Sequence, residues 1–167
     1  TSWEVIAEHT ELFVSFGGVP LKNLSVNPGG IGQHTSQEQL RAAHHRGTSF
    51  VLVSPLRDDL SASLDAEWLP VVPGTGIALM LGLAHTLVTE GLADSTFLER
   101  YCAGYETFEA YLMGTDGGVP KSPEWAESIC QIPAATLRSL ARRMARSRTL
   151  VNVNYSLQRA HHGEQAP

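Results

Sequence analysis

The sequence has little positive charge and no long apolar segment. Twelve lysines and arginines stand against 17 aspartates and glutamates, which gives a net charge of -5, and only two of the cations are lysines. Such a chain has no basic field that would attract a nucleic-acid backbone or an anionic membrane surface. The longest apolar stretch, Ile77 to Leu83, is far shorter than the roughly 20 residues that cross a bilayer. We therefore expect a soluble chain with neither nucleic acid nor membrane as a partner.

Cysteine is scarce as well. Cys102 and Cys130 form no CxxC pair, and they suit small buried residues better than a disulfide framework or a metal site. The histidine pairs His44-His45 and His161-His162 would point about 100° apart on a helix, so the two members of a pair do not readily share one ion. No metal ligand is therefore predicted in this chain.

The hydrophobic residues that the chain does have, 43% of its length, are enough for one sizeable core. Short apolar runs alternate with segments of helical periodicity. Strands are predicted at residues 11–16, 49–53, 68–72 and 149–153. Helices are predicted at residues 36–46, 77–89, 95–100, 105–113, 123–130 and 134–145. This order predicts an α/β fold: a Rossmann-like open parallel sheet with flanking helices and a helical excursion before the last strand, in a single domain over residues 1–167.

Two polar loops follow the first two predicted strands. GGVPLKN, residues 17–23, offers backbone amides without Cβ crowding and one lysine, which suits a phosphate. SPLRDD, residues 54–59, comes where such folds place groups that bind a ribose or a base. The alternative for the first loop is an ordinary strand-to-helix turn, because neither GxGxxG nor GxxxxGK[ST] is present. The alternative for the second loop is a solvated turn with an Asp-rich helix start.

A third polar cluster follows the last predicted strand. Ser156, Gln158, Arg159 and Glu164 would reach the same edge of the sheet as the two loops, because parallel strands end on one side. The alternative is that an exposed chain end is simply polar. The chain opens on Thr1 and closes without a helix stop, and we expect it to be a fragment of a larger chain.

The segment YSLQRAHHGEQ, residues 155–165, resembles the string Trp-Ser-x-Gln-Arg-x-x-His-Gly-Glu-Gln of molybdopterin oxidoreductases of the dimethyl sulfoxide reductase family. Further segments are similar to the biotin sulfoxide and trimethylamine N-oxide reductase branch and fall in the same order. They are FGGVPLKN, VSPLRDD, EWLPVVPGTGIALMLGLAHTLVTEGLADSTFLERYCAGYETFEAYLMG and DGGVPKSPEWAESICQIPAATLRSLARRMA. The resemblance covers nearly the whole chain.

This resemblance implies a domain that binds a bis(molybdopterin guanine dinucleotide) molybdenum cofactor in an enzyme that reduces an S-oxide or N-oxide. The other domains of the parent enzyme and an unidentified electron donor would be its partners. The fragment alone would be inactive, because the serine that ligates molybdenum in this branch lies upstream of the matching region. The branch has cytoplasmic and periplasmic members, so the compartment stays open.

The resemblance also implies roles for single residues. Those of the first loop run against pterin and phosphate, those of the second loop meet the guanosine of one dinucleotide, and a PGTG loop lies near its base. Arg159 would in addition orient the oxide substrate in a funnel. The implied cofactor-binding residues are Gly17, Gly18, Pro20, Lys22, Asn23, Ser54, Pro55, Arg57, Asp58, Gly74, Thr75, Gly76, Ser156, Gln158 and Arg159.

Two positions depart from the family pattern, which commonly has Asp at position 76 and Asp or Asn at position 19, where this chain has Gly76 and Val19. One alternative hypothesis is therefore a degenerate or stand-alone nucleotide-binding module without catalytic activity. A flavin or nicotinamide domain is the other, but the glycine fingerprint expected of it is missing.

The Gly76→Asp substitution tests the implied contact with guanine. An aspartate there accepts two hydrogen bonds from a guanine edge, and a charged acceptor of this kind contributes on the order of 1.5–3 kcal/mol. We expect the variant to bind GMP at least tenfold more tightly than the unmodified chain in a calorimetric titration. Equal affinities would contradict the base contact.

Overall fold

The computed structural model describes residues 2–24, 34–115 and 117–155. The chain forms two compact units. One consists of Thr1–Gly76 and Ser147–Pro167 and is called the sheet unit here, and the other consists of Ile77–Arg146 and is called the helical unit. The predicted single domain stays a prediction.

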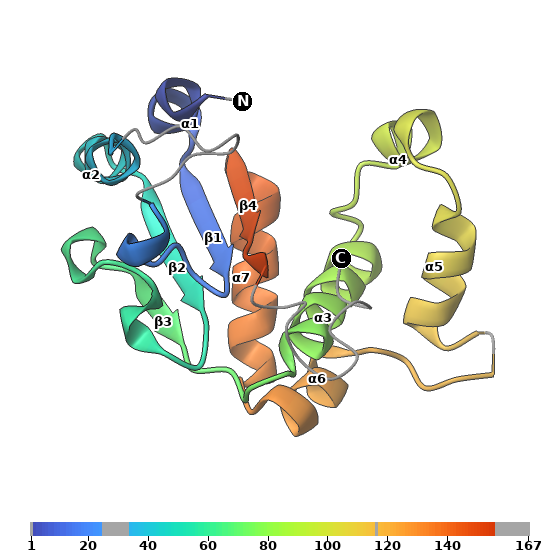
Figure 1. The fold of residues 1–167 in the computed structure, drawn as a ribbon. Coiled ribbons are helices and arrows are strands. Elements are labelled where there is room, and N and C mark those ends of the chain that lie inside the picture. The colour runs from blue at the N-terminus through green and yellow to red at the C-terminus, as the bar shows by residue number, and fades with distance from the viewer. Residues whose placement is uncertain (1, 25–33, 116, 156–167) are drawn as a thin grey trace. The chain divides into compact units, whose positions relative to one another are not determined.

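Four parallel strands form the centre of the sheet unit (Figure 1). Their order across the sheet is β3-β2-β1-β4. Their bounds are Leu12–Phe16 for β1, Ser49–Val53 for β2, Glu67–Leu69 for β3 and Thr149–Val153 for β4. In register, Phe16 of β1 pairs with Val53 and Val153, so three strands end at the same level. The predicted α/β fold with a parallel sheet is confirmed.

The third strand differs from its predicted span of residues 68–72. It begins one residue earlier, at Glu67, and ends at Leu69. Pro70 follows directly, and proline has no N–H to donate to a strand ladder. Val71 N–H instead donates to Leu69 O at 2.9 Å, which bends the chain out of the sheet.

Helices α1 (Trp3–His9) and α2 (Ser36–His45) cover one face of this sheet (Figure 1). Ala7, Leu40 and Ala43 from these helices pack with strand residues whose side chains alternate along β1 and β2, among them Phe13 and Phe50. The rings of that aromatic pair stack with centroids 5.3 Å apart. Together these side chains form a core on this face of the sheet.

No element is predicted before residue 11, where the structure has helix α1. Trp3, Ile6 and Ala7 follow the helical spacing i, i+3, i+4 and pack against the core of the sheet unit. Ser2 is the N-cap, with its side chain accepting from Val5 N–H. The helix spans only seven residues, which is too short for periodicity to stand out from the sequence.

The helical unit contains the other five α-helices that the structure describes. All five lie where the sequence pattern predicts them, within one residue at each end. They are α3 (Gly76–Thr89), α4 (Ser95–Tyr101), α5 (Tyr105–Met113), α6 (Pro123–Cys130) and α7 (Ala134–Arg146). None of the described helices is both long and apolar enough to span a membrane.

The helical unit buries the apolar stripe of α7 and pairs part of its arginine face. Leu137, Leu140 and Ala141 are buried, whereas Arg142 binds both carboxylate oxygens of Glu90, at 2.7 and 2.8 Å. The hydrogen bond from Arg142 holds the pKa of the Glu90 carboxyl below its usual range.

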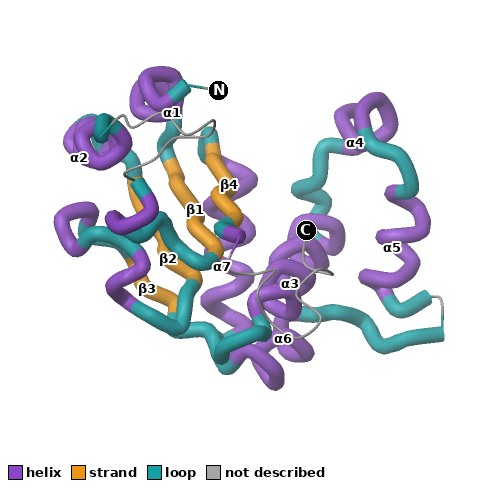
Figure 2. Tube along the Cα trace, viewed as in Figure 1, coloured by secondary structure: helices purple, strands orange, loops and turns teal. Residues whose placement is uncertain are grey.

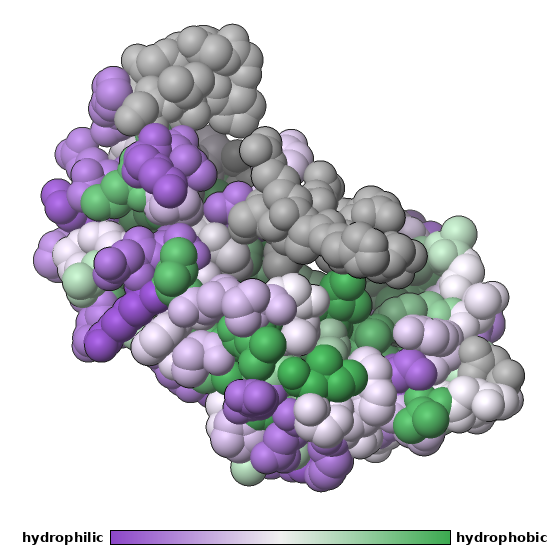
Figure 3. Space-filling view, turned by 60° about the horizontal axis from the view of Figure 1, so that its bottom comes forward, coloured by the Kyte–Doolittle hydropathy of each residue, from purple (hydrophilic) through white to green (hydrophobic). Residues whose placement is uncertain are grey.

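Figure 3 shows one face of the molecule, where hydrophobic residues lie in small groups among hydrophilic ones.

A glycine sets how closely the helices of this unit pack. A Cβ on Gly82 of α3 would lie 2.8 Å from Ala126 Cβ of α6 and 3.3 Å from Leu137 Cδ1 of α7. Ala126 is fully buried and its methyl group has no other rotamer to adopt. The missing side chain at residue 82 therefore permits the close approach of α3 to α6.

The Gly82→Ala variant tests this packing. Alanine favours a helix over glycine by about 1 kcal/mol, but overpacking of a well-filled core costs about 1–3 kcal/mol. We expect a net loss in the free energy of unfolding, measured by chemical denaturation. A more stable variant would show that α3 and α6 are not in close contact.

Candidate functional site

The candidate site lies at the edge of the sheet unit where the parallel strands end (Figure 2). Gly17–Val19, called the glycine turn here, follows β1, and Ser54–Asp59, called the serine turn, follows β2. Asn152 lies in β4, and Asn154 directly follows it. Loops at the carboxyl ends of parallel strands are where open α/β sheets bind ligands.

The glycine turn packs directly on Asp59. Val19 N–H donates to Asp59 O at 2.8 Å, and Gly17 N–H donates to Val53 O at 2.9 Å. Gly18 is buried with φ +78°, and a Cβ built on it would lie 2.5 Å from Asp59 Cβ and 2.8 Å from the Asp59 carbonyl carbon. Only glycine fits a backbone of this conformation at this distance.

Ser54 connects the serine turn to two strands. Its hydroxyl donates to Asp59 Oδ2 at 2.5 Å and accepts from Leu56 N–H at 3.3 Å. Its backbone carbonyl accepts from the Trp68 indole N–H of β3 at 2.8 Å. Ser54 is 1% exposed, and its hydroxyl holds the carboxylate of Asp59 in place beside the glycine turn.

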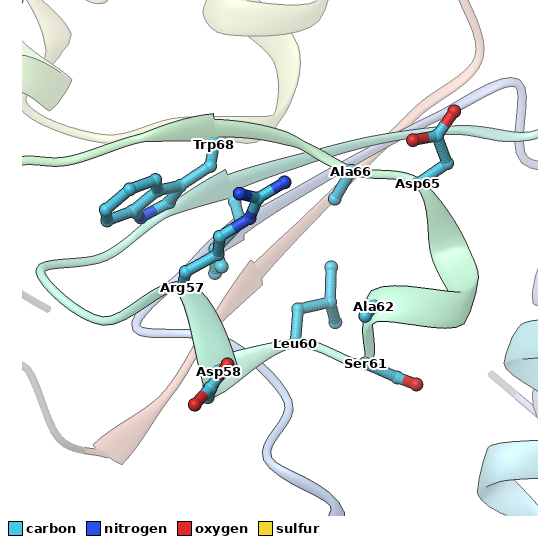
Figure 4. Close-up of a pocket in the computed structure, with 9 residues that line it drawn as sticks. Arg57, Asp58, Leu60, Ser61, Ala62, Asp65, Ala66 and Trp68 are labelled. Carbon is cyan, nitrogen blue, oxygen red and sulfur yellow. The ribbon is translucent and has the colours of Figure 1, made fainter.

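A pocket of about 110 Å³ lies between the serine turn and β3 (Figure 4). Arg57 extends across it toward Trp68, Leu60 points into it, and the carboxylates of Asp58 and Asp65 lie at opposite sides. A guanidinium can bind an anionic oxygen, carboxylates can bind ribose hydroxyls, and an indole can bind the ring of a nucleoside. The lining residues are Leu52, Arg57, Asp58, Leu60, Ser61, Ala62, Asp65, Ala66 and Trp68.

The predicted residues of the two loops lie at this edge of the sheet. Pro20 is buried, whereas Lys22 and Asn23 are exposed on a short 3₁₀ helix, Leu21–Asn23. Pro55, Arg57 and Asp58 are exposed as well. Contact between the glycine turn and the serine turn through Asp59 joins the two loops. The cofactor roles of these residues stay predictions.

The PGTG loop leaves the sheet beyond β3. Gly74 is exposed with φ +79°, and the Thr75 hydroxyl donates to Val72 O at 2.7 Å. Gly76 is buried and is the first residue of α3. An aspartate at this position would be favoured by the helix dipole, because the position is the start of a helix.

The last group of predicted residues, Ser156, Gln158 and Arg159, lies outside the described residues. Within the described ranges, no group of three or more histidines, cysteines, aspartates or glutamates is arranged to hold a metal ion.

Three residues of the site were missed by sequence reasoning. Asp59 closes the predicted loop of residues 54–59 but is not among the implied cofactor-binding residues, although its backbone and carboxylate join both loops. Asn152 falls within the strand predicted at residues 149–153, and Asn154 lies between that strand and the predicted polar cluster. Asn-x-Asn at the end of a strand was the available signal, because amide side chains there face the preceding loop rather than an apolar core.

The fold places the chain among α/β proteins with a parallel sheet, in which ligand-binding loops gather at one edge. A segment of acetylene hydratase from Pelobacter acetylenicus has the same fold, with a TM-score of 0.68 and 22% sequence identity over 90% of this chain and 19% of that enzyme. This likeness shows the fold alone. No protein-family model matches the chain.

Sequence comparison then gives the family. The chain is 47% identical over 160 residues to a biotin sulfoxide reductase of Cereibacter sphaeroides. It is 39% identical over 166 residues to a dimethyl sulfoxide/trimethylamine N-oxide reductase of the same organism, and 38% identical over 168 residues to a trimethylamine-N-oxide reductase of Haemophilus influenzae. These alignments cover 96–99% of this chain.

The chain belongs to the dimethyl sulfoxide reductase family of molybdopterin oxidoreductases, in its biotin sulfoxide and trimethylamine N-oxide reductase branch. It spans about a fifth of the length of these relatives, 20–22%.

The Gly18→Ala variant tests the close approach of the glycine turn to Asp59. A left-handed backbone costs alanine about 1–2 kcal/mol, and displacement of Asp59 adds a further penalty of about 1–3 kcal/mol. We therefore expect the free energy of unfolding to fall by the sum of these two costs.

Gly74→Ala is the matched control, because Gly74 has nearly the same φ, +79°, with no atom within 4 Å of an added Cβ. It should lose only the backbone cost. Equal losses for the two variants in chemical denaturation would mean that Gly18 does not pack on Asp59.

Proposed function

We propose that the chain is the cofactor-binding domain of a molybdenum oxidoreductase that reduces an S-oxide or N-oxide. The cofactor would be a bis(molybdopterin guanine dinucleotide), of which this domain binds one nucleotide part. When bound, this cofactor supplies the two-electron redox chemistry of molybdenum. Two electrons and two protons convert the oxide into a sulfide or an amine and one water, and an unidentified donor supplies the electrons.

The observation that carries the proposal is the packing of Gly18 on Asp59 beside the serine turn. This packing joins the two loops, because Asp59 occupies the space that a Cβ on Gly18 would need. Residues 17 and 18 also have no side chains to crowd backbone amides of the kind that bind a phosphate. Lys22, one turn further along the chain, is exposed and supplies a cation for the same anionic group. The residues present therefore fit the diphosphate of a dinucleotide.

The pocket beside Arg57 supports the nucleoside part of the proposal. Its carboxylates suit the ribose hydroxyls or the N–H edge of guanine, and Arg57 suits a phosphate or ribose oxygen. Trp68 offers its ring to a base while its N–H is used by Ser54. The chain's own groups would bind and orient the nucleotide here, and the oxide would be reduced elsewhere in the parent enzyme.

The names of the relatives favour an S-oxide as the substrate class. The relative with 47% identity is named as a biotin sulfoxide reductase, and those named as trimethylamine-N-oxide reductases have 36–38% identity. We therefore expect the full-length protein to reduce biotin sulfoxide faster than trimethylamine N-oxide.

A nucleotide-binding module without catalytic activity is the second candidate. Gly76 and Val19 favour it, because both positions lack a polar side chain that the family commonly carries. Such a module would use the same pocket and the same glycine turn for a free nucleotide. It differs from the first proposal in needing no molybdenum.

Chemical analysis of the purified full-length protein separates the two candidates. For the reductase we expect two GMP molecules per molybdenum after acid hydrolysis, and reduction of biotin sulfoxide with a chemical electron donor. GMP without molybdenum would support the module instead. Absence of both would contradict the proposed cofactor.

A further inference from the structure

Asn152 of β4 and Asn154, the residue that follows β4, hold the glycine turn from the side opposite Asp59. Asn152 Nδ2 donates to Gly18 O at 3.3 Å and to the Ser15 hydroxyl at 2.9 Å. Asn154 Nδ2 donates to Gly17 O at 3.2 Å and to Gly18 O at 3.3 Å. The two residues are more than 130 positions away from the turn in sequence, so the sheet brings them together.

The peptide groups of the turn are therefore oriented from both sides. In a trans peptide the C=O and the next N–H point in opposite directions, and the described chain has no cis peptide. Gly18 O faces the asparagines, and Val19 N–H accordingly points the other way, where it donates to Asp59 O at 2.8 Å. β4 and the serine turn together fix this peptide plane.

The same geometry directs the Gly18 N–H. Because Gly17 O faces Asn154, the N–H of the same peptide group points away from β4. Among the described residues, no acceptor is recorded for it. It is thus a backbone donor whose direction is set by Asn154, on a residue that is buried.

The pairing of the strands does not depend on these amides. β1 already pairs with β2 and β4, and the ladder continues beyond the strands through Gly17 N–H to Val53 O and Asn154 N–H to Phe16 O. Gly17 is half-buried, so water can reach its carbonyl, and the net gain from a bond that replaces water there is small. Gly18 is buried, and its carbonyl accepts from both amides. The amides set the direction in which the peptide groups of the turn point.

We propose that Asn152 and Asn154 are positioning residues, which orient the glycine turn so that its backbone binds the cofactor. The proposal rests on the cofactor-binding function proposed above. Asn154 has the larger share, since it binds both turn carbonyls, whereas Asn152 binds one of them and also Ser15.

The test follows how fast the cofactor leaves the full-length protein. Asn154→Ala removes both amide bonds to the turn. We expect GMP and molybdenum to be lost on dialysis about tenfold faster than from the unmodified protein, because the loss of one or two hydrogen bonds weakens binding by about that factor. Asn152→Ala should accelerate the loss less. Asn154→Gln keeps the amide donor and should restore at least part of the retention.

Thr48→Val is the matched control for stability. Thr48 is buried at the opposite end of the sheet, where its hydroxyl donates to Thr10 O at 2.7 Å, so the variant also loses one bond from a side chain to the backbone. We expect its cofactor loss to stay within about twofold of the unmodified protein. Thermal denaturation with and without cofactor gives a second readout. Thr48→Val should lower the transition temperatures of the loaded and the empty protein equally. Asn154→Ala should lower the transition temperature of the loaded protein more than that of the empty protein.

Two results would overturn the assignment. One is a loss rate for Asn154→Ala equal to that of the unmodified protein. The other is the same acceleration in Thr48→Val, which would make the effect one of stability alone. If the unmodified full-length protein holds neither GMP nor molybdenum, the cofactor-binding function itself fails, and that result is distinct from both.

Discussion

The contact between Gly18 and Asp59 is the constraint on which the rest of the site depends. It joins the turn after β1 to the turn after β2 at a distance that excludes a side chain. Ser54 holds Asp59 through its hydroxyl and receives the indole N–H of Trp68 on its carbonyl. A change at this contact would therefore reach both the glycine turn and the pocket, because the two share Asp59 and its neighbours.

The parallel sheet makes this contact possible. β1, β2 and β4 end in register at Phe16, Val53 and Val153, so the loops that follow them start at one level. A turn held on one side by Asp59 and on the other by asparagine amides keeps its peptide planes fixed before any ligand arrives. Preorganised backbone donors of this kind bind anions without a cost of reordering the loop.

Much of the fold was predictable from the sequence, because its strands are buried apolar runs and its long helices have clear periodicity. The β3 strand was misplaced because the apolar pattern of Trp68 to Val72 continues past Pro70, and only the missing N–H of proline ends the ladder. Helix α1 was missed because seven residues give little periodicity. Asp59, Asn152 and Asn154 were missed because their importance lies in bonds between segments distant in sequence, which local patterns do not contain.

The central claim is that this edge of the sheet binds a guanine dinucleotide of a molybdenum cofactor. A crystal structure of the loaded full-length protein tests it most directly. The account predicts a cofactor oxygen within hydrogen-bonding distance of the Gly18 N–H and a guanosine in the pocket lined by Arg57 and Trp68. A cofactor bound with no atom against the glycine turn or in that pocket would contradict it.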